Sequence, residues 1–77
     1  MKRFTVTAGS KSNPITQQVE IPTAEEGKMT PAQAREASRI AFGHTTGVTV
    51  MDKGGEGYRL NGSKARRVSN GEYGYDF

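Results

Sequence analysis

Basic side chains gather in the last third of the chain, and they are the residues most able to do chemistry. Between Gly57 and Ser69 the sequence holds four basic residues and no acidic one. Clustered lysines and arginines bind phosphates or carboxylates, and on nucleic acid they gain affinity by releasing counterions. A tyrosine beside them can stack on a base. The residues of this segment that we predict to bind a partner are Tyr58, Arg59, Lys64, Arg66 and Arg67.

A second, smaller basic group lies on a predicted helix. Arg35 and Arg39 are four residues apart, so they project from the same side of that helix. Both groups also have a simpler interpretation, because solvated charges on helix faces and edge strands are common and discourage aggregation. The single sign of charge in residues 57–69, in a chain whose net charge is only +3, favours the binding interpretation.

Residue patterns that would support catalysis or hold a cofactor are missing from the sequence. His44 is the only histidine, and alone it makes neither a catalytic triad nor a metal site. The stretch Gly54-Gly55-Glu56-Gly57 resembles a phosphate-binding loop only superficially. It lies between two predicted strands, and no Lys-Ser or Lys-Thr follows it. We therefore expect no enzymatic activity, no metal and no cofactor.

The size and composition of the chain limit the fold that carries these residues. Its 77 residues allow one small domain, which buries only about 60% of the surface that its unfolded chain exposes. The sequence has no cysteine, which excludes a disulfide scaffold and a cysteine-ligated metal and favours the cytosol over secretion. No apolar run approaches the roughly 20 residues of a membrane span.

The first elements that position the basic groups follow from the alternation of apolar and polar residues. Residues 3–8 and 15–21 alternate with the period of a half-buried strand, and a turn-forming segment of six residues, 9–14, lies between them. We predict a hairpin whose second strand ends before Pro22, since proline cannot donate to a strand ladder.

A helix is predicted from Pro31 to about Phe42. Thr30 and Gln33 have the spacing of a capping box, and Gly43 provides a left-handed end. The predicted buried stripe consists of Ala34, Ala37, Ile40 and Ala41, with Gln33, Arg35, Glu36 and Arg39 outside it.

Three further strands are predicted over residues 48–51, 58–60 and 63–68. The dipeptide Asn61-Gly62 is typical of a type I′ turn between the last two strands. That turn predicts a register in which Leu60 faces Ser63, Arg59 faces Lys64 and Tyr58 faces Ala65. In this register Arg59, Lys64 and Arg66 share one face, while Arg67 is turned away. Like charges directly opposite each other cost stability, and an anionic partner that covers them lowers this cost.

Together these elements predict an α+β fold: a single antiparallel sheet in the order β-β-α-β-β-β, with one helix packed on one face. The tail 69–77 places Tyr73, Tyr75 and Phe77 in alternation. We expect it to form either a sixth strand or a disordered aromatic end.

The part of the chain from Thr30 to Val68 resembles a known family. An alanine-rich basic helix, Ala32-Gln33-Ala34-Arg35-Glu36-Ala37-Ser38-Arg39, precedes His44. A Gly-Val-Thr-Val strand (residues 47–50), a glycine turn and a basic strand that ends at Val68 follow. This arrangement is similar to that of small phage-encoded anti-CRISPR proteins, in particular a β-β-α-β-β group that inhibits type I interference complexes.

The resemblance implies a non-enzymatic inhibitor in the cytoplasm of a host bacterium. In the proteins that the chain resembles, basic and polar surface residues mimic or displace nucleic acid on the backbone subunits of the complex, so that guide RNA cannot pair with target DNA. The contacts that it implies here are Arg35 and Arg39 on the helix and Arg59, Lys64, Arg66 and Arg67 on the last hairpin. The tail from Gly71 to Phe77 has no counterpart in it.

Two other functions also fit the sequence. A small nucleic-acid-binding module would place these cations directly on phosphates. A phage structural or assembly protein would dimerise through the aromatic tail. The expected partners are therefore subunits of a host interference complex, nucleic acid itself or a second copy of the chain. We expect no membrane partner, and a chain that is either a monomer or a homodimer.

Overall fold

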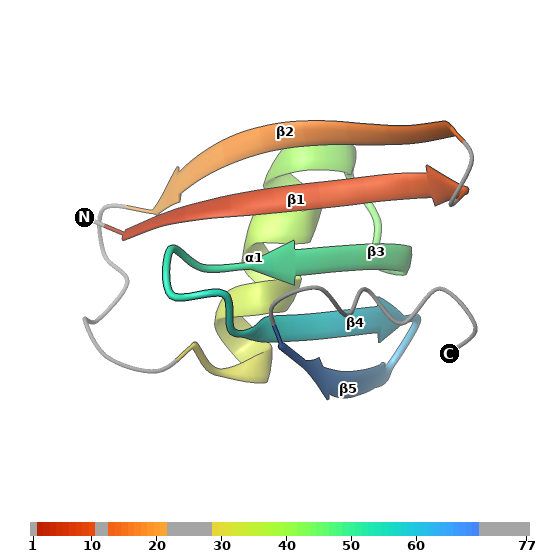
Figure 1. Ribbon diagram of the computed structural model, residues 1–77. Helices are drawn as coiled ribbons and strands as arrows, with labels where there is room; N and C mark the ends of the chain where they lie inside the picture. The colour runs from red at the N-terminus through yellow and green to blue at the C-terminus, as the bar shows by residue number, and fades with distance from the viewer. Residues whose placement is uncertain (1, 11–12, 22–28, 70–77) are drawn as a thin grey trace.

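Five strands form one antiparallel sheet, and a single helix crosses one of its faces (Figure 1). The computed structural model describes residues 2–10, 13–21 and 29–69. The elements are β1 Lys2–Ser10, β2 Asn13–Ile21, α1 Pro31–Phe42, β3 Thr46–Met51, β4 Gly57–Asn61 and β5 Lys64–Val68. The order β2-β1-β3-β4-β5 across the sheet makes β2 and β5 its two edges. The predicted fold class and element order are confirmed, while the predicted sixth strand lies outside the described residues.

The β1–β2 hairpin is longer than its hydrophobic pattern indicates. Gly9 pairs with Pro14 and Ser10 with Asn13, so the prediction of a six-residue loop between the strands is wrong. Gly9 has φ +92°, and a Cβ atom there would lie 2.7 Å from the carbonyl oxygen of Asn13. A glycine at this position therefore lets the pairing continue toward the turn, beyond the last apolar residue of β1.

Helix α1 begins and ends where its sequence signals predict. The Thr30 hydroxyl accepts from the Gln33 amide at 3.2 Å, and the Gln33 side-chain oxygen accepts from the Thr30 amide at 3.4 Å. These two bonds form the capping box, which satisfies amides that have no partner within the helix. At the other end Gly43 adopts φ +78°, and its amide donates to the carbonyl oxygen of Arg39 at 2.9 Å.

The prediction that Ile40 belongs to the buried stripe of the helix is wrong. Ala34 and Ala37 are fully buried, but Ile40 is 58% exposed and Ser38 is buried in its place. The Ser38 hydroxyl donates to the carbonyl oxygen of His44, so the helix buries this polar group with its hydrogen bond made. The helix is therefore rotated about its axis relative to the predicted stripe, and Ile40 lies at its side.

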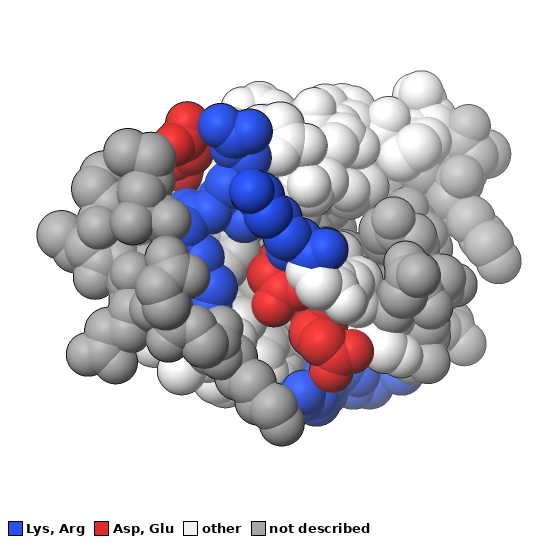
Figure 2. All heavy atoms as spheres, turned by 60° about the vertical axis from the view of Figure 1, so that its left-hand side comes forward, with Lys and Arg blue, Asp and Glu red and all other residues white. Residues whose placement is uncertain are grey.

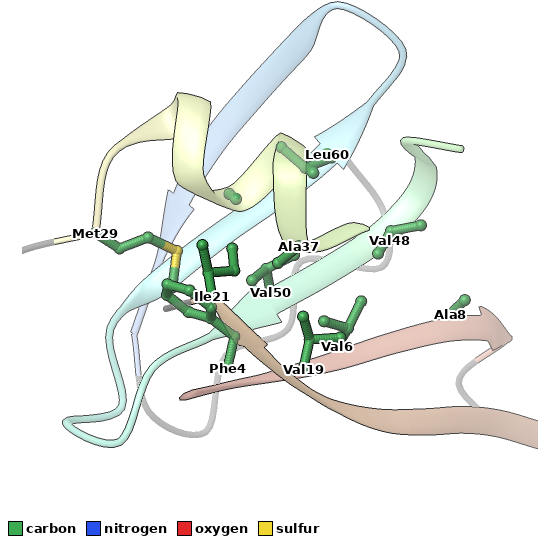
Figure 3. Close-up of a cluster of buried hydrophobic side chains, with 11 residues drawn as sticks. Phe4, Val6, Ala8, Val19, Ile21, Met29, Ala37, Val48, Val50 and Leu60 are labelled. Atoms are coloured by element: carbon green, nitrogen blue, oxygen red, sulfur yellow. The ribbon is translucent and has the colours of Figure 1, made fainter. Parts of the chain in front are cut away.

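The core fills the space between α1 and one face of the sheet. Helix α1 packs against β1, β2, β3 and β4. Figure 3 shows Met29 pointing toward Phe4 and Ile21 from the residue before the helix cap. The buried core residues are Phe4, Val6, Ala8, Val19, Ile21, Met29, Ala34, Ala37, Val48, Val50 and Leu60. Because the helix contributes only alanines to this cluster, its backbone lies close to the sheet.

The turn between β4 and β5 differs from the predicted one. Asn61 pairs with Lys64, so the two-residue turn is Gly62-Ser63. Gly62 has φ +67°, and no described residue other than glycine has positive φ. A glycine at the first central position alone is typical of a type II′ turn, whereas type I′ needs positive φ at both central residues.

The new turn moves the register of β4 and β5 by two residues. Leu60 faces Ala65, Arg59 faces Arg66 and Tyr58 faces Arg67, so the predicted pairs are wrong. A shift of two residues keeps every side chain on its face, because side chains alternate with period two. Arg59, Lys64 and Arg66 consequently share the face away from α1, as predicted, and Arg67 lies on the helix face.

Candidate interaction surface

The predicted binding residues divide between the two faces of the β4–β5 hairpin. Lys64, Arg66 and Arg67 are exposed on β5, which is an edge strand among the residues that the structure describes. We call these three residues the β5 edge. Lys64 and Arg66 project from the face away from α1, and Arg67 projects from the helix face.

Arg59 lies at a different depth from the rest of the predicted group. It is 7% exposed, and its guanidinium donates to the hydroxyl of the fully buried Thr49 at 3.2 Å. The simpler interpretation of the group as solvated edge-strand charges therefore does not describe Arg59, which we predicted to bind a partner and which is buried. A side chain held in this way positions its neighbours on β4 and contributes little accessible surface for a partner.

Arg67 is held by an ion pair across the start of the hairpin. Its guanidinium donates to the Glu56 carboxylate at 2.9 Å, and about half of each side chain is exposed. The hydrogen bond to Glu56 and the negative charge of that carboxylate raise the pKa of Arg67. Arg67 consequently presents a cation whose charge is partly balanced by its neighbour.

Tyr58 lies beside Arg67 on the helix face of β4. It faces Val50 on one side and Arg67 on the other, and it packs against the hydrophobic core. Tyr58 is half-buried. Part of its ring therefore packs against the core, and only the remaining part is accessible for stacking on a base.

The helical pair of arginines is brought next to the hairpin turn. Arg35 is half-buried and donates to the carbonyl oxygen of Ser63 at 3.1 Å, which ties α1 to the turn that precedes β5. Arg39 is exposed in the last turn of the helix. The tertiary structure therefore places Arg35 next to Ser63, the residue that precedes Lys64, although the two are 28 positions apart in the sequence.

Positively and negatively charged side chains lie together on at least one face of the molecule. Figure 2 shows blue and red side chains interleaved on the face that comes forward from the left of Figure 1. Ion pairs join Arg3 to Glu20 across β1 and β2, at 3.3 Å, and Arg67 to Glu56 at the β4–β5 hairpin, at 2.9 Å. On the β5 edge, Lys64 faces Asn61 of β4 and Arg66 faces Arg59.

In the glycine-rich turn between β3 and β4, the backbone amides bind the carboxylate of Asp52 from the same turn. An Asp52 oxygen accepts from the amides of Gly54 and Glu56 at 2.9 and 3.0 Å. The Asp52 amide also donates to the carbonyl oxygen of Glu56 at 2.8 Å. A phosphate would need these loop amides as donors. The geometry supports the prediction that this segment is a turn between strands.

His44 also has a local structural contact. Its Nδ1 atom accepts from the amide of Thr46 at 3.3 Å in the connection between α1 and β3. In the part of the chain that the structure describes, no group of three or more histidine, cysteine or acidic residues could hold a metal ion. No helix among these residues is long and apolar enough to cross a membrane.

Sequence reasoning missed three residues that shape this region: Thr49, Asp52 and Glu56. Asp52 had a readable signal, because aspartate two residues before a glycine is typical of a turn closed by its own side chain. Thr49 and Glu56 had no such local signal. Thr49 on β3 contacts Arg59 on β4, and Glu56 in the β3–β4 turn contacts Arg67 on β5.

Comparisons with known proteins returned no match. Neither a family model, nor a curated protein, nor a solved structure matched this chain.

Proposed function

We propose that the protein is a non-enzymatic inhibitor that binds an anionic surface of a type I interference complex along the β5 edge. The observation that carries this proposal is the exposure of Lys64, Arg66 and Arg67 on one short edge strand, where no acidic residue interrupts them. An edge strand is accessible from both faces and from its side, so a partner can lie along it.

The position of the cations suits an extended anionic ligand. Lys64 and Arg66 reach it from the face away from α1, and Arg67 reaches it from the helix face. Arg35, held at the turn by Ser63, and the exposed Arg39 extend the positive charge along the helix. A phosphate backbone or a row of carboxylates running past β5 would thus meet cations on both of its sides.

Occupation of a surface is sufficient for inhibition of this kind. A protein that covers an anionic surface of a nucleic-acid-guided complex prevents the natural ligand of that complex from docking, without any reaction. Such a role requires a rigid scaffold and an exposed charged edge. The partner in this proposal comes from the family resemblance of residues 30–68, and the contacting residues come from the exposures described above.

A pair of lysine variants tests the β5 edge. Lys64→Glu reverses a charge on β5, and Lys53→Glu makes the same change on an exposed lysine of the β3–β4 turn. We expect Lys64→Glu, and more strongly the double variant with Arg66→Glu, to lose binding to the purified complex by at least about tenfold. Lys53→Glu should bind nearly as well as the unchanged chain.

The readout is a pull-down with the purified interference complex, together with a mobility-shift assay of the complex on its target DNA. The proposal is overturned if the unchanged chain neither binds the complex nor blocks its target, or if the two lysine variants lose binding equally. Thermal unfolding of each variant separates a lost contact from a lost fold.

Direct nucleic-acid binding is the alternative that uses the same residues. It predicts affinity for short DNA or RNA alone, with a log–log salt slope of roughly −0.7 to −0.9 per phosphate contacted. Salt-sensitive binding to naked nucleic acid that Lys64→Glu weakens would favour this module over the inhibitor. An assembly role through the aromatic tail would instead require Tyr73, Tyr75 and Phe77, which lie outside the described residues.

A further inference from the structure

We propose that the chain forms a two-fold symmetric dimer in which β2 pairs antiparallel with β2 of a second copy, making a ten-stranded sheet. This inference concerns the edge opposite to β5 and does not depend on the partner proposed above. It begins from a contrast between the two edges of the sheet. Three of the five residues of β5 are basic, whereas residues 13–19 of β2 carry no charge.

Uncharged edge strands are unusual because they invite pairing with another strand. Proteins protect such edges with lysines, prolines or very short strands, and β2 carries one of these features, Pro14, as its second residue. Here β2 is nine residues long, and residues 13–18 are all exposed. Its only charged residue, Glu20, already binds Arg3 at 3.3 Å. The edge is therefore open along most of its length.

The pairing of β1 with β2 shows which backbone groups of β2 are available. Gly9 faces Pro14, and proline has no amide hydrogen, so this is a non-hydrogen-bonded pair. Such pairs alternate with hydrogen-bonded ones in an antiparallel ladder. The backbone amides of Thr16, Gln18 and Glu20 therefore point away from β1, toward the open edge. Their side chains contact β1, as Gln18 does by donating to the Thr5 hydroxyl at 3.0 Å.

One exposed apolar side chain lies on β2 itself, and another lies on the last turn of α1. Ile15 on β2 and Ile40 in the last turn of α1 are 55% and 58% exposed, and they are the large hydrophobic residues that the described chain leaves exposed. Figure 1 shows the C-terminal end of α1 behind β2. Ile15 shares the face of Val19, which is buried under the helix, because residues two apart on a strand project to the same side.

A second copy of the chain is the occupant that fits this edge best. Each copy carries a net charge of +3, so contact between two β5 edges would oppose cations. Two β2 strands approach without that cost. When the two-fold axis passes through Gln17, Thr16 of one copy faces Gln18 of the other in a hydrogen-bonded pair, and Ile15 faces Val19 of the other copy. Ile15 is then brought toward the helix end that carries Ile40.

The predicted pairing can be trapped with a single cysteine, since the chain has none of its own. Gln17 would face Gln17 of the other copy in a non-hydrogen-bonded pair, whose Cα atoms lie about 4.5 Å apart, within the range that a disulfide spans. Under mild oxidation Gln17→Cys should therefore form a covalent dimer rapidly at low protein concentration. Ser63→Cys, on the exposed turn next to the opposite edge, is the matched control and should cross-link much more slowly.

Two measurements without a cross-link complete the test. Sedimentation equilibrium should give twice the 8.3 kDa of one chain, and Gln17→Lys should weaken the dimer at least about tenfold. Ser63→Lys adds the same charge near the β5 edge and should leave the dimer unchanged. In hydrogen exchange, the Thr16 and Gln18 amides should become protected as concentration rises, while the Gln17 amide is protected throughout.

The proposal is overturned if the unchanged chain sediments at 8.3 kDa even at millimolar concentration. It is equally overturned if a dimer forms that Gln17→Lys leaves intact, because another surface would then hold the copies together. Equal cross-linking rates for Gln17→Cys and Ser63→Cys would also contradict it.

Discussion

Arg59 and Arg66 face each other across β4 and β5, yet Arg66 is exposed and Arg59 is 7% exposed. Arg59 belongs to β4, which lies between β3 and β5, whereas Arg66 belongs to the edge strand β5. Arg59 reaches back over β3 and donates to the Thr49 hydroxyl at 3.2 Å. Arg59 therefore contributes to the packing of the sheet, whereas Arg66 on the next strand is accessible to solvent or to a partner.

Replacement of Arg59 by alanine should destabilise the fold. The change removes a buried charged hydrogen-bond donor and leaves the Thr49 hydroxyl without it, which costs about 1–3 kcal/mol. Chemical denaturation followed by circular dichroism measures the free energy of unfolding. Lys64→Ala, at an exposed position of the neighbouring strand, is the control and should change this free energy by less than about 0.5 kcal/mol. Equal effects of the two variants would contradict a buried structural role for Arg59.

Gly57 should tolerate no larger residue. A Cβ atom there would collide with the carbonyl oxygen of Val50 and lie 2.8 Å from the Met51 sulfur, and the first of these atoms belongs to the neighbouring strand's backbone. We expect Gly57→Ala to lower the free energy of unfolding by at least about 3 kcal/mol or to prevent folding.

The control for Gly57 separates collision from conformational strain. Gly43 has φ +78°, and an added Cβ would meet no atom within 4 Å. Gly43→Ala should therefore cost only the left-handed conformation of an L-residue, about 1–2 kcal/mol. Thermal unfolding should rank the two variants in this order, and the reverse order would show that the approach of β3 to β4 is looser than described.

The capping box should make a measurable and local contribution to stability. Thr30→Ala removes the hydroxyl that accepts from the Gln33 amide, and the loss of such a cap costs about 1 kcal/mol. Thr30→Ser keeps a hydroxyl at the same place and should recover most of the loss. Denaturant titration of both variants tests this, and equal destabilisation by alanine and serine would contradict the capping role.

The Arg67–Glu56 pair should respond to salt and not to alkaline pH. Glu56 raises the pKa of Arg67, so the stability gained from this shift is present below the ordinary pKa of an arginine and is lost only at still higher pH. The difference in melting temperature between Arg67→Gln and the unchanged chain should therefore be the same at about pH 7 and about pH 10. It should shrink as salt rises from about 0.05 M to about 1 M, because both side chains are about half exposed. A difference that survives high salt would indicate a packing role for Arg67.

Interactions between residues close together in the sequence determined the helix, its two ends and the alternating faces of the strands. The helix start follows from Thr30-Pro31-Ala32-Gln33, because every contact of a capping box lies within four residues. The left-handed end at Gly43 and the alternation of the first two strands are equally local. The faces of Arg59, Lys64, Arg66 and Arg67 were predictable for the same reason, since alternation along a strand survives a register shift of two residues.

The tertiary structure alone decided which of these residues are accessible. The contact of Arg59 with Thr49 joins two different strands, and exposure of Ile40 depends on how α1 is rotated against the strands. The strand order, which makes β2 and β5 the edges, and the contact of Arg35 with Ser63 join residues far apart in the chain. Periodicity reports which side of an element is apolar, but it carries no information about which other element covers it. Packing between distant segments supplies that information. It decides that Arg59 is buried while the cations of the β5 edge are exposed.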